Sequence, residues 1–203
     1  MATHLSALPL VALLGMSSAA QTNGGNRPDL TVHLYDYVAI SEETLRHAIG
    51  EAGRILRTAG IATEWHVHAF HEPAVVASAV RFTFGPTDLA VRVMPAEMAV
   101  LMGLAPDALG FAFPSQIEGI GTLALVIFDQ IENTARQPGL LMGHVIAHEV
   151  GHLLLGPDSH SMTGIMQDPW TPTVLDQAYR GQLFFMPDQA SLMRARLNAR
   201  DNE

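Results

Sequence analysis

Hydrophobic and polar positions along the chain alternate in patterns that predict several strands. Residues 30–38 (LTVHLYDYV) alternate with a period of two, which is typical of a half-buried strand. Similar but shorter runs predict further strands at 61–67, 89–94 and 110–113. Pro114 ends the last of these and favours an edge position for it, because proline cannot donate a backbone hydrogen bond to a neighbouring strand. The unbroken apolar run 122–128 (TLALVIF) indicates a strand that is covered on both faces.

Three other segments have the character of helices. An apolar stripe at helical spacing follows Ser41, a residue suited to cap a helix N-terminus, and ends at Gly60. A second helix is expected from about 140 to 155, and a C-terminal helix over 188–200 should dock on the domain. Its arginines are expected on a solvated face: Arg194, Arg196 and Arg200. The order of strand, helix, several strands and helix, without an internal repeat, predicts a single α+β domain over 29–203 with a mixed sheet.

The first 28 residues have a different composition. Residues 5–16 are almost entirely apolar and precede Ser18-Ala19-Ala20, small residues of the kind that a signal peptidase recognises. This pattern predicts a signal peptide over 1–20 and a linker over 21–28, although only His4 stands where basic residues usually precede the apolar run. The alternative is a disordered or helical tail. The run is shorter than the roughly 20 residues that a membrane span needs, so we expect a secreted or periplasmic protein with no membrane span.

Composition excludes several kinds of chemistry. The 203 residues include 11 basic and 20 acidic side chains, for a formal charge of −9, which disfavours nucleic acid as a partner. All of the basic residues are arginine, so mechanisms that need a lysine amine are absent. There is no cysteine, which excludes disulfides, thiol nucleophiles and thiolate metal sites. Histidine, with ten residues, is the abundant metal-binding side chain.

The second predicted helix contains the sequence His148-Glu149-Val150-Gly151-His152, which is an HExxH pattern. Residues four apart lie on one face of a helix, so the two imidazoles can bind one ion. Glu149 lies about 100° around the helix axis from His148 and can address a metal-bound water. The pattern therefore predicts a zinc site in which His148 and His152 are ligands and Glu149 is a general base. The simpler interpretation is a helix whose two histidines bind no metal.

A catalytic zinc needs a third protein ligand. The only glutamate beyond the motif is Glu203, so a glutamate from a following helix cannot complete the site. Gly156 is suited to end the helix and turn the chain back, which can bring His160 to the ion. Asp158 is the rival ligand, and Asp176 is a more distant alternative. We favour His160, because imidazole is the commoner third ligand in such sites and Asp158 can act as a cap or as a partner of a ligand.

These residues resemble the metzincins, a family of zinc peptidases. The resemblance lies in the HExxH pattern, the glycine turn, His160 and then Gly164-Ile165-Met166, which is similar to the family's methionine turn. Residues 109–114 and 125–129 are similar to the edge strand and the following strand of matrixin-type catalytic domains. The resemblance extends over about 29–170, but only 148–166 carries specific motifs.

The chain also departs from the family pattern. Glycine and the third ligand usually follow the second histidine by three and six residues, whereas Gly156 and His160 follow His152 by four and eight, and Asp158 occupies the family's ligand position. Asp168 stands two residues after Met166, where some metzincins have a tyrosine. The sequence has no cysteine for thiolate latency, and we expect no pro-segment of useful length.

The resemblance implies a metzincin-like fold, in which a backing helix and an active-site helix cover a twisted mixed sheet and a methionine turn and C-terminal helix follow. It also implies a zinc-dependent endopeptidase that hydrolyses peptide bonds through a zinc-bound water, with Glu149 as general base. The substrate, a peptide or protein, would pair with the edge strand over 110–113, and we expect a monomer. The alternative is a non-catalytic binding module of the same fold with structural or lost zinc. Glu149 argues for the enzyme, because a structural zinc site has no use for a general base.

Overall fold

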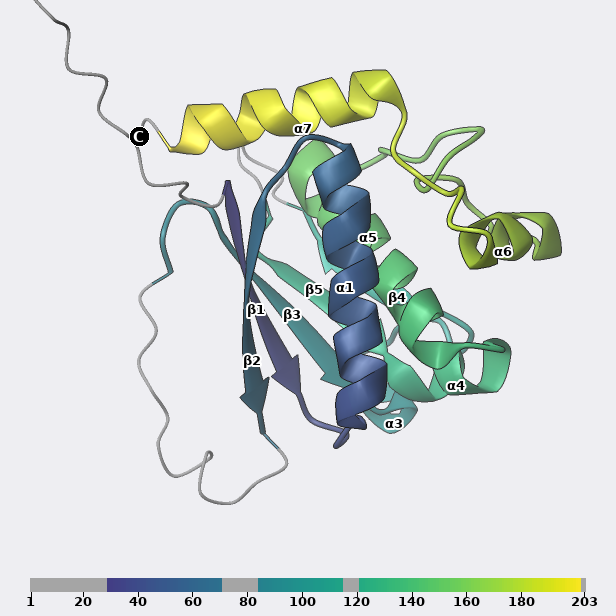
Figure 1. Cartoon of the computed structure of the whole chain (residues 1–203). Coiled ribbons are helices and arrows are strands. Elements are labelled where there is room, and N and C mark those ends of the chain that lie inside the picture. Colours follow the sequence, from purple (N-terminus) through teal and green to yellow (C-terminus); the bar gives the residue numbers. More distant parts are fainter. Residues whose placement is uncertain (1–28, 71–83, 115–120, 202–203) are drawn as a thin grey trace, which may run out of the picture.

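A five-stranded mixed sheet forms the centre of the structure, a computed structural model that describes residues 29–70, 84–114 and 121–201 (Figure 1). The strands lie in the order β2 (Thr63–Ala69), β1 (Leu30–Asp36), β3 (Asp88–Met94), β5 (Leu123–Ile127) and β4 (Gly110–Phe113). The first four are parallel, and β4 runs antiparallel to β5 at one edge. The expected α+β class with a mixed sheet is therefore confirmed, as is the edge position of 110–113. The predicted signal peptide and linker lie outside the described residues.

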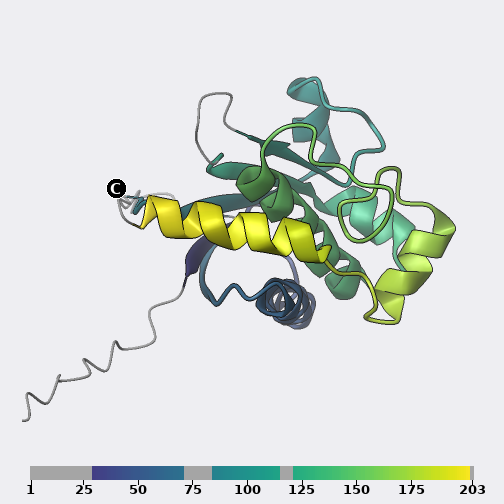
Figure 2. The ribbon, with the colours of Figure 1, turned by 90° about the horizontal axis from the view of Figure 1, so that it is seen from above.

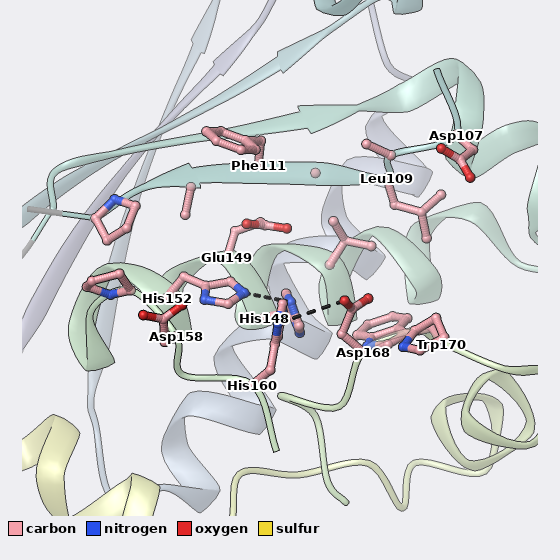
Figure 3. A pocket seen from close by; sticks show the side chains of 17 residues that line it. Asp107, Leu109, Phe111, His148, Glu149, His152, Asp158, His160, Asp168 and Trp170 are labelled. Atoms are coloured by element: carbon pink, nitrogen blue, oxygen red, sulfur yellow. Dashed lines mark hydrogen bonds and ion pairs between the residues drawn. The ribbon is translucent and has the colours of Figure 1, made fainter. Parts of the chain in front are cut away.

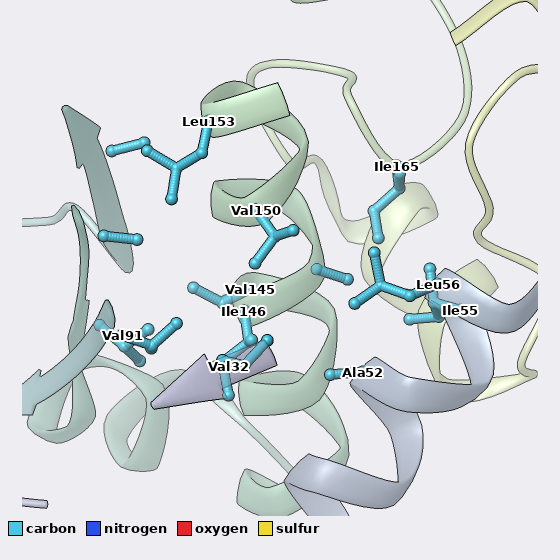
Figure 4. Close-up of a cluster of buried hydrophobic side chains, with 14 of the residues drawn as sticks. Val32, Ala52, Ile55, Leu56, Val91, Val145, Ile146, Val150, Leu153 and Ile165 are labelled. Carbon is cyan, nitrogen blue, oxygen red and sulfur yellow. The ribbon is translucent and has the colours of Figure 1, made fainter. Parts of the chain in front are cut away.

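Two helices cover one face of this sheet (Figure 1). Helix α1 (Glu42–Thr58) begins as expected after Ser41, whose hydroxyl accepts a hydrogen bond from the Thr44 amide at 3.2 Å. Helix α5 (Pro138–Leu155) lies beside α1, and most of its residues are buried. Because the sheet and both helices turn their apolar sides toward one another, they enclose a single hydrophobic core (Figure 4).

The alternation predicted for β1 is visible in this core. Leu30, Val32 and Leu34 are fully buried and belong to the core cluster on the helix-covered side. His33 and Tyr35, at the alternate positions, belong to the opposite face, where their rings lie against histidines of β2.

Helix α7 (Pro187–Arg200) crosses the ends of α1 and α5 (Figures 1 and 2). The expectation that its arginines form a solvated face is wrong. All three donate to backbone carbonyl groups of other segments: Arg194 to Ala59, Arg196 to Leu154, and Arg200 to Pro86. The first two acceptors lie at the C-terminal ends of α1 and α5, where helical carbonyl groups have no partner within the helix. The arginines therefore attach α7 to the domain.

Three short helices complete the described part of the chain: α3 (Ala96–Leu101), α4 (Phe128–Thr134) and α6 (Pro172–Tyr179). Among the described residues, no helix combines the length and the apolar character that crossing a membrane requires.

Candidate metal centre

Helix α5 and the turn after it bring three histidines together (Figure 3). The helix ends at Gly156, whose φ of 88° is a conformation that glycine adopts without steric cost. The chain then turns back beneath the helix end. Ring nitrogens of His148, His152 and His160 lie within 4.8 Å of one another, which is close enough to hold one metal ion.

Each of the three imidazoles has a partner on its Nδ1 side. Nδ1 of His148 lies 2.7 Å from the carbonyl oxygen of Ile165. Because a carbonyl oxygen can only accept, Nδ1 carries the proton and Nε2 keeps a lone pair. Nδ1 of His152 lies 2.9 Å from the hydroxyl of Ser159, and Nδ1 of His160 lies 3.8 Å from the carboxylate of Asp168. Such partners orient the rings of metal-binding histidines.

The Nε2 atoms of the two helical histidines converge as a result. Those of His148 and His152 are 3.0 Å apart. Two nitrogen ligands on a tetrahedral ion, each about 2.05 Å from it, are separated by about 3.3 Å. The two helical histidines therefore need to move by only a few tenths of an ångström to share an ion.

Burial keeps the helical histidines in the neutral form that binds metals. It lowers the pKa of His148 to about 4, and it lowers the pKa of His152 to about 3 with a further contribution from the two neighbouring histidines. At neutral pH both rings therefore hold an available lone pair.

Glu149 extends from the same helix toward β4 (Figure 3). The residue is only 6% exposed, and burial raises the pKa of its carboxyl group to about 8. Gly110 of β4 makes room for this group, because a Cβ atom at that position would lie 2.6 Å from Oε1 of Glu149. A cation held by the three imidazoles would favour the ionised carboxylate.

A tight turn below the histidines contains Met166, which is fully buried. The amide of Ser161 donates to the Met166 carbonyl at 2.9 Å, and the amide of Gln167 donates to the Gly164 carbonyl at 3.1 Å. The amide of Ile165 is held by the carbonyl of Phe184 at 2.8 Å. These bonds fix the position of the carbonyl group that faces His148.

A pocket of about 580 Å³ lies over the histidines. Its walls come from the segment that leads into β4, from α5, from the turn after α5 and from the segment 168–170. The ring of Trp170 stands edge-on to His148 with the ring centres 5.5 Å apart. The site is thus open to a molecule much larger than water.

The structure brings together the four residues that the sequence singled out: His148, Glu149, His152 and His160. Asp158, the rival ligand, lines the pocket but is not part of the histidine cluster. Asp176 lies on α6, where it forms an ion pair with Arg180 at 2.8 Å, and it does not line the pocket.

Sequence reasoning missed several residues of the site. Ser159, Asp168 and Trp170 carry no motif, and only their nearness to His160 and Met166 in the sequence could have suggested them. His144, one turn before His148 on α5, is fully buried, and its Nε2 lies 3.4 Å from the carboxylate of Glu51 on α1.

Comparison with known proteins leaves the function open. No protein-family model matches the chain, and no curated protein is significantly similar to it. The geometry of the site must therefore carry any functional assignment.

Proposed function

We propose that this chain is a zinc-dependent endopeptidase in which His148, His152 and His160 bind the metal and Glu149 is the general base. The main support is that three imidazoles converge beside a buried carboxylate that faces the same open pocket. A purely structural zinc site has four protein ligands and no need of such a carboxylate.

Zinc is the ion that fits this donor set best. Neutral imidazole is a good ligand for zinc, and three histidines leave one tetrahedral position open, as in catalytic zinc sites. The sequence resemblance to metzincins, with Met166 in a buried turn below the ligands, supports the same choice.

The bound zinc would supply a Lewis acid and lower the pKa of water toward about 7. Glu149 stands next to the first ligand and can accept a proton from the attacking water. The same carboxyl group can then deliver that proton to the nitrogen of the departing amine. Because Glu149 is buried, few water molecules can take up this proton, and it passes between the carboxyl group and the reactants.

The edge strand β4 supports a peptide as the substrate. In the described sheet, β4 has a neighbour on only one side, and its residues 110–112 line the pocket. An extended peptide can therefore form backbone hydrogen bonds with the open edge while its central bond lies over the metal site. This arrangement favours cleavage within flexible segments of a chain.

The first test is zinc content, measured by elemental analysis after dialysis. We expect one zinc per chain in the wild type, loss of zinc in His160→Ala, and retention in Asp158→Asn. Asn is a matched control, because it tolerates the positive φ of 59° at residue 158. Loss of zinc in Asp158→Asn together with retention in His160→Ala would reverse the assignment of the third ligand.

The second test is hydrolysis of unfolded casein. Glu149→Gln should keep its zinc and lose activity by about 10²- to 10⁴-fold, the contribution expected of a general base. Glu97→Gln, an exposed change on α3, is the matched control and should behave as wild type. If the zinc-loaded Glu149→Gln protein cleaves casein as fast as the wild type, the proposed mechanism is wrong. A zinc-loaded wild type that cleaves no peptide would favour the binding module.

A further inference from the structure

Apart from the three histidines, the ionisable side chains that line the pocket over the metal site are all carboxylic acids. Its lining contains the three aspartates Asp107, Asp158 and Asp168 in addition to Glu149, and it contains no arginine. Since the chain has no lysine, the described lining offers no permanent cation to a substrate. Glu149 is the fourth carboxyl group: it is 94% buried, faces the pocket, and forms no hydrogen bond or ion pair with another described residue.

Five arginines of the described chain are engaged away from the pocket. Arg54 pairs with Glu51, Arg180 pairs with Asp176, and the arginines of α7 bind backbone carbonyl groups. Within the described segments, no ion pair joins an arginine to Asp107 or Asp158. Asp168 faces His160 at 3.8 Å. Asp107 and Asp158 are both exposed and remain available to a substrate.

The carboxyl groups are divided between the two ends of the pocket. Asp107 lies beyond Leu109 at one end, on the same side as Asp168 and Trp170, whereas Asp158 lies at the other end beside His152 (Figure 3). The first end thus combines apolar walls with a carboxylate at the mouth. Arginine and lysine side chains have the complementary form, with an apolar stem and a cationic tip.

We propose that the preferred substrates are peptide segments that carry an arginine or a lysine next to the cleaved bond. The stem of that side chain packs against Leu109 and Trp170, and its charged tip reaches Asp107. Asp158 adds a weaker preference for a second cation at the other end. This inference rests on the proposed endopeptidase function, and it names the substrate class of that site.

The test compares two quenched fluorescent peptides that differ only in arginine or citrulline flanking the central bond, because citrulline has the same shape without the charge. For the zinc-loaded wild type at low salt, we expect kcat/KM to be about tenfold higher for the arginine peptide. The ratio should fall as sodium chloride is added.

Variants locate the source of the preference. Asp107→Asn should lower the arginine-to-citrulline ratio about threefold, as expected for loss of one exposed charge interaction. Asp107→Lys should lower it further, because the new cation repels the substrate. Asp176→Asn, an aspartate of α6 outside the pocket, should leave the ratio unchanged.

Equal cleavage of the two peptides would overturn this inference and leave the endopeptidase proposal intact. If neither peptide is cleaved, the endopeptidase proposal fails. The preference for a cation is then tested by binding alone, with fluorescence anisotropy of the same two peptides and the Glu149→Gln protein. Tighter binding of the arginine peptide would support a cation-selective pocket, and equal affinities would overturn it.

Discussion

At the scale of single residues, the position of the Glu149 carboxylate depends on the missing side chain at Gly110. A Cβ atom there would lie 2.6 Å from Oε1, so Gly110→Ala must displace either the carboxylate or the backbone of β4. We expect kcat/KM to fall at least about tenfold with unchanged zinc content, because misplaced catalytic groups lose large factors in rate.

Gly50→Ala is the matched control for this prediction. A Cβ atom at Gly50 meets nothing within 4 Å, and the residue lies inside α1. Alanine favours helix there by about 1 kcal/mol, so activity should stay and stability should rise slightly. Full activity in Gly110→Ala would show that the close approach to β4 does not position Glu149.

A second prediction at this scale concerns the hydroxyl of Ser159. It lies 2.9 Å from Nδ1 of His152 and helps to orient that ring. Ser159→Ala should weaken zinc binding by about 10- to 100-fold, the usual cost of losing a partner of a metal ligand. Competition with a chromogenic chelator measures this, and Ser191→Ala on α7 serves as the control. An unchanged zinc affinity would mean that the hydroxyl does not hold the ring.

The sequence predicts the helical part of the site because its geometry is local. A spacing of four residues places His148 and His152 on one face of whatever helix contains them. The partners of these rings are not local in this way. The carbonyl of Ile165 has no side-chain signature, and Asp168 faces His160 only because the turn at Met166 folds back on the preceding segment.

At the scale of secondary-structure elements, α1 and α5 meet around a partly buried carboxylate. His144 of α5 faces the carboxylate of Glu51, which also binds the guanidinium of Arg54 at 2.6 Å. Burial lowers the pKa of His144, although the Glu51 charge acts in the opposite direction. The pKa of Glu51 is also lowered, because the bond to Arg54 and the charge of His144 together outweigh burial.

Acid should therefore weaken the contact between these helices. As the pH falls below about 6.5, the unfolded chain protonates His144 before the folded one does, so folding stability is lost. Protonation of Glu51 removes more stability below about pH 4.5. Urea unfolding of metal-free protein at pH 7.5 and 5.5 should show a smaller pH effect in His144→Gln than in wild type. An equal pH effect in His144→Gln and in the wild type would contradict this assignment. His47→Gln, an exposed change on α1, is the control.

The elements that the sequence predicts well are the long ones with a clear period. The cap at Ser41 and the stripe after it define α1, and the alternation of 30–38 defines β1. Helices α3 and α4, with six and seven residues, span too few turns to show a period. The order of strands in the sheet depends on the crossover connections, and no local pattern specifies it.

At the scale of the whole molecule, the metal site joins α5 to the two turns that follow it. His148 and His152 belong to α5, His160 follows the turn at Gly156, and the carbonyl of Ile165 attaches the next turn to His148. An ion bound to all three histidines therefore stabilises the fold as well as the site.

Removal of the metal should lower the melting temperature. At free zinc about 1,000-fold above its Kd, binding contributes about 4 kcal/mol, which corresponds to about 10 °C for a domain of this size. Calorimetry with and without EDTA measures the difference. His148→Ala, which lacks a ligand, should melt at the same temperature in both buffers. An equal response of this variant and the wild type to EDTA would place the stabilising ion elsewhere.

The open edge of β4 also affects how the protein behaves in concentrated solution. A strand edge that accepts a peptide can pair with the edge of another copy, and β4 carries two half-exposed aromatic side chains, Phe111 and Phe113. With only four residues, β4 offers few backbone bonds, so such pairing should be weak and reversible. A saturating peptide that occupies the edge would act as a solubiliser and should reduce light scattering by concentrated samples.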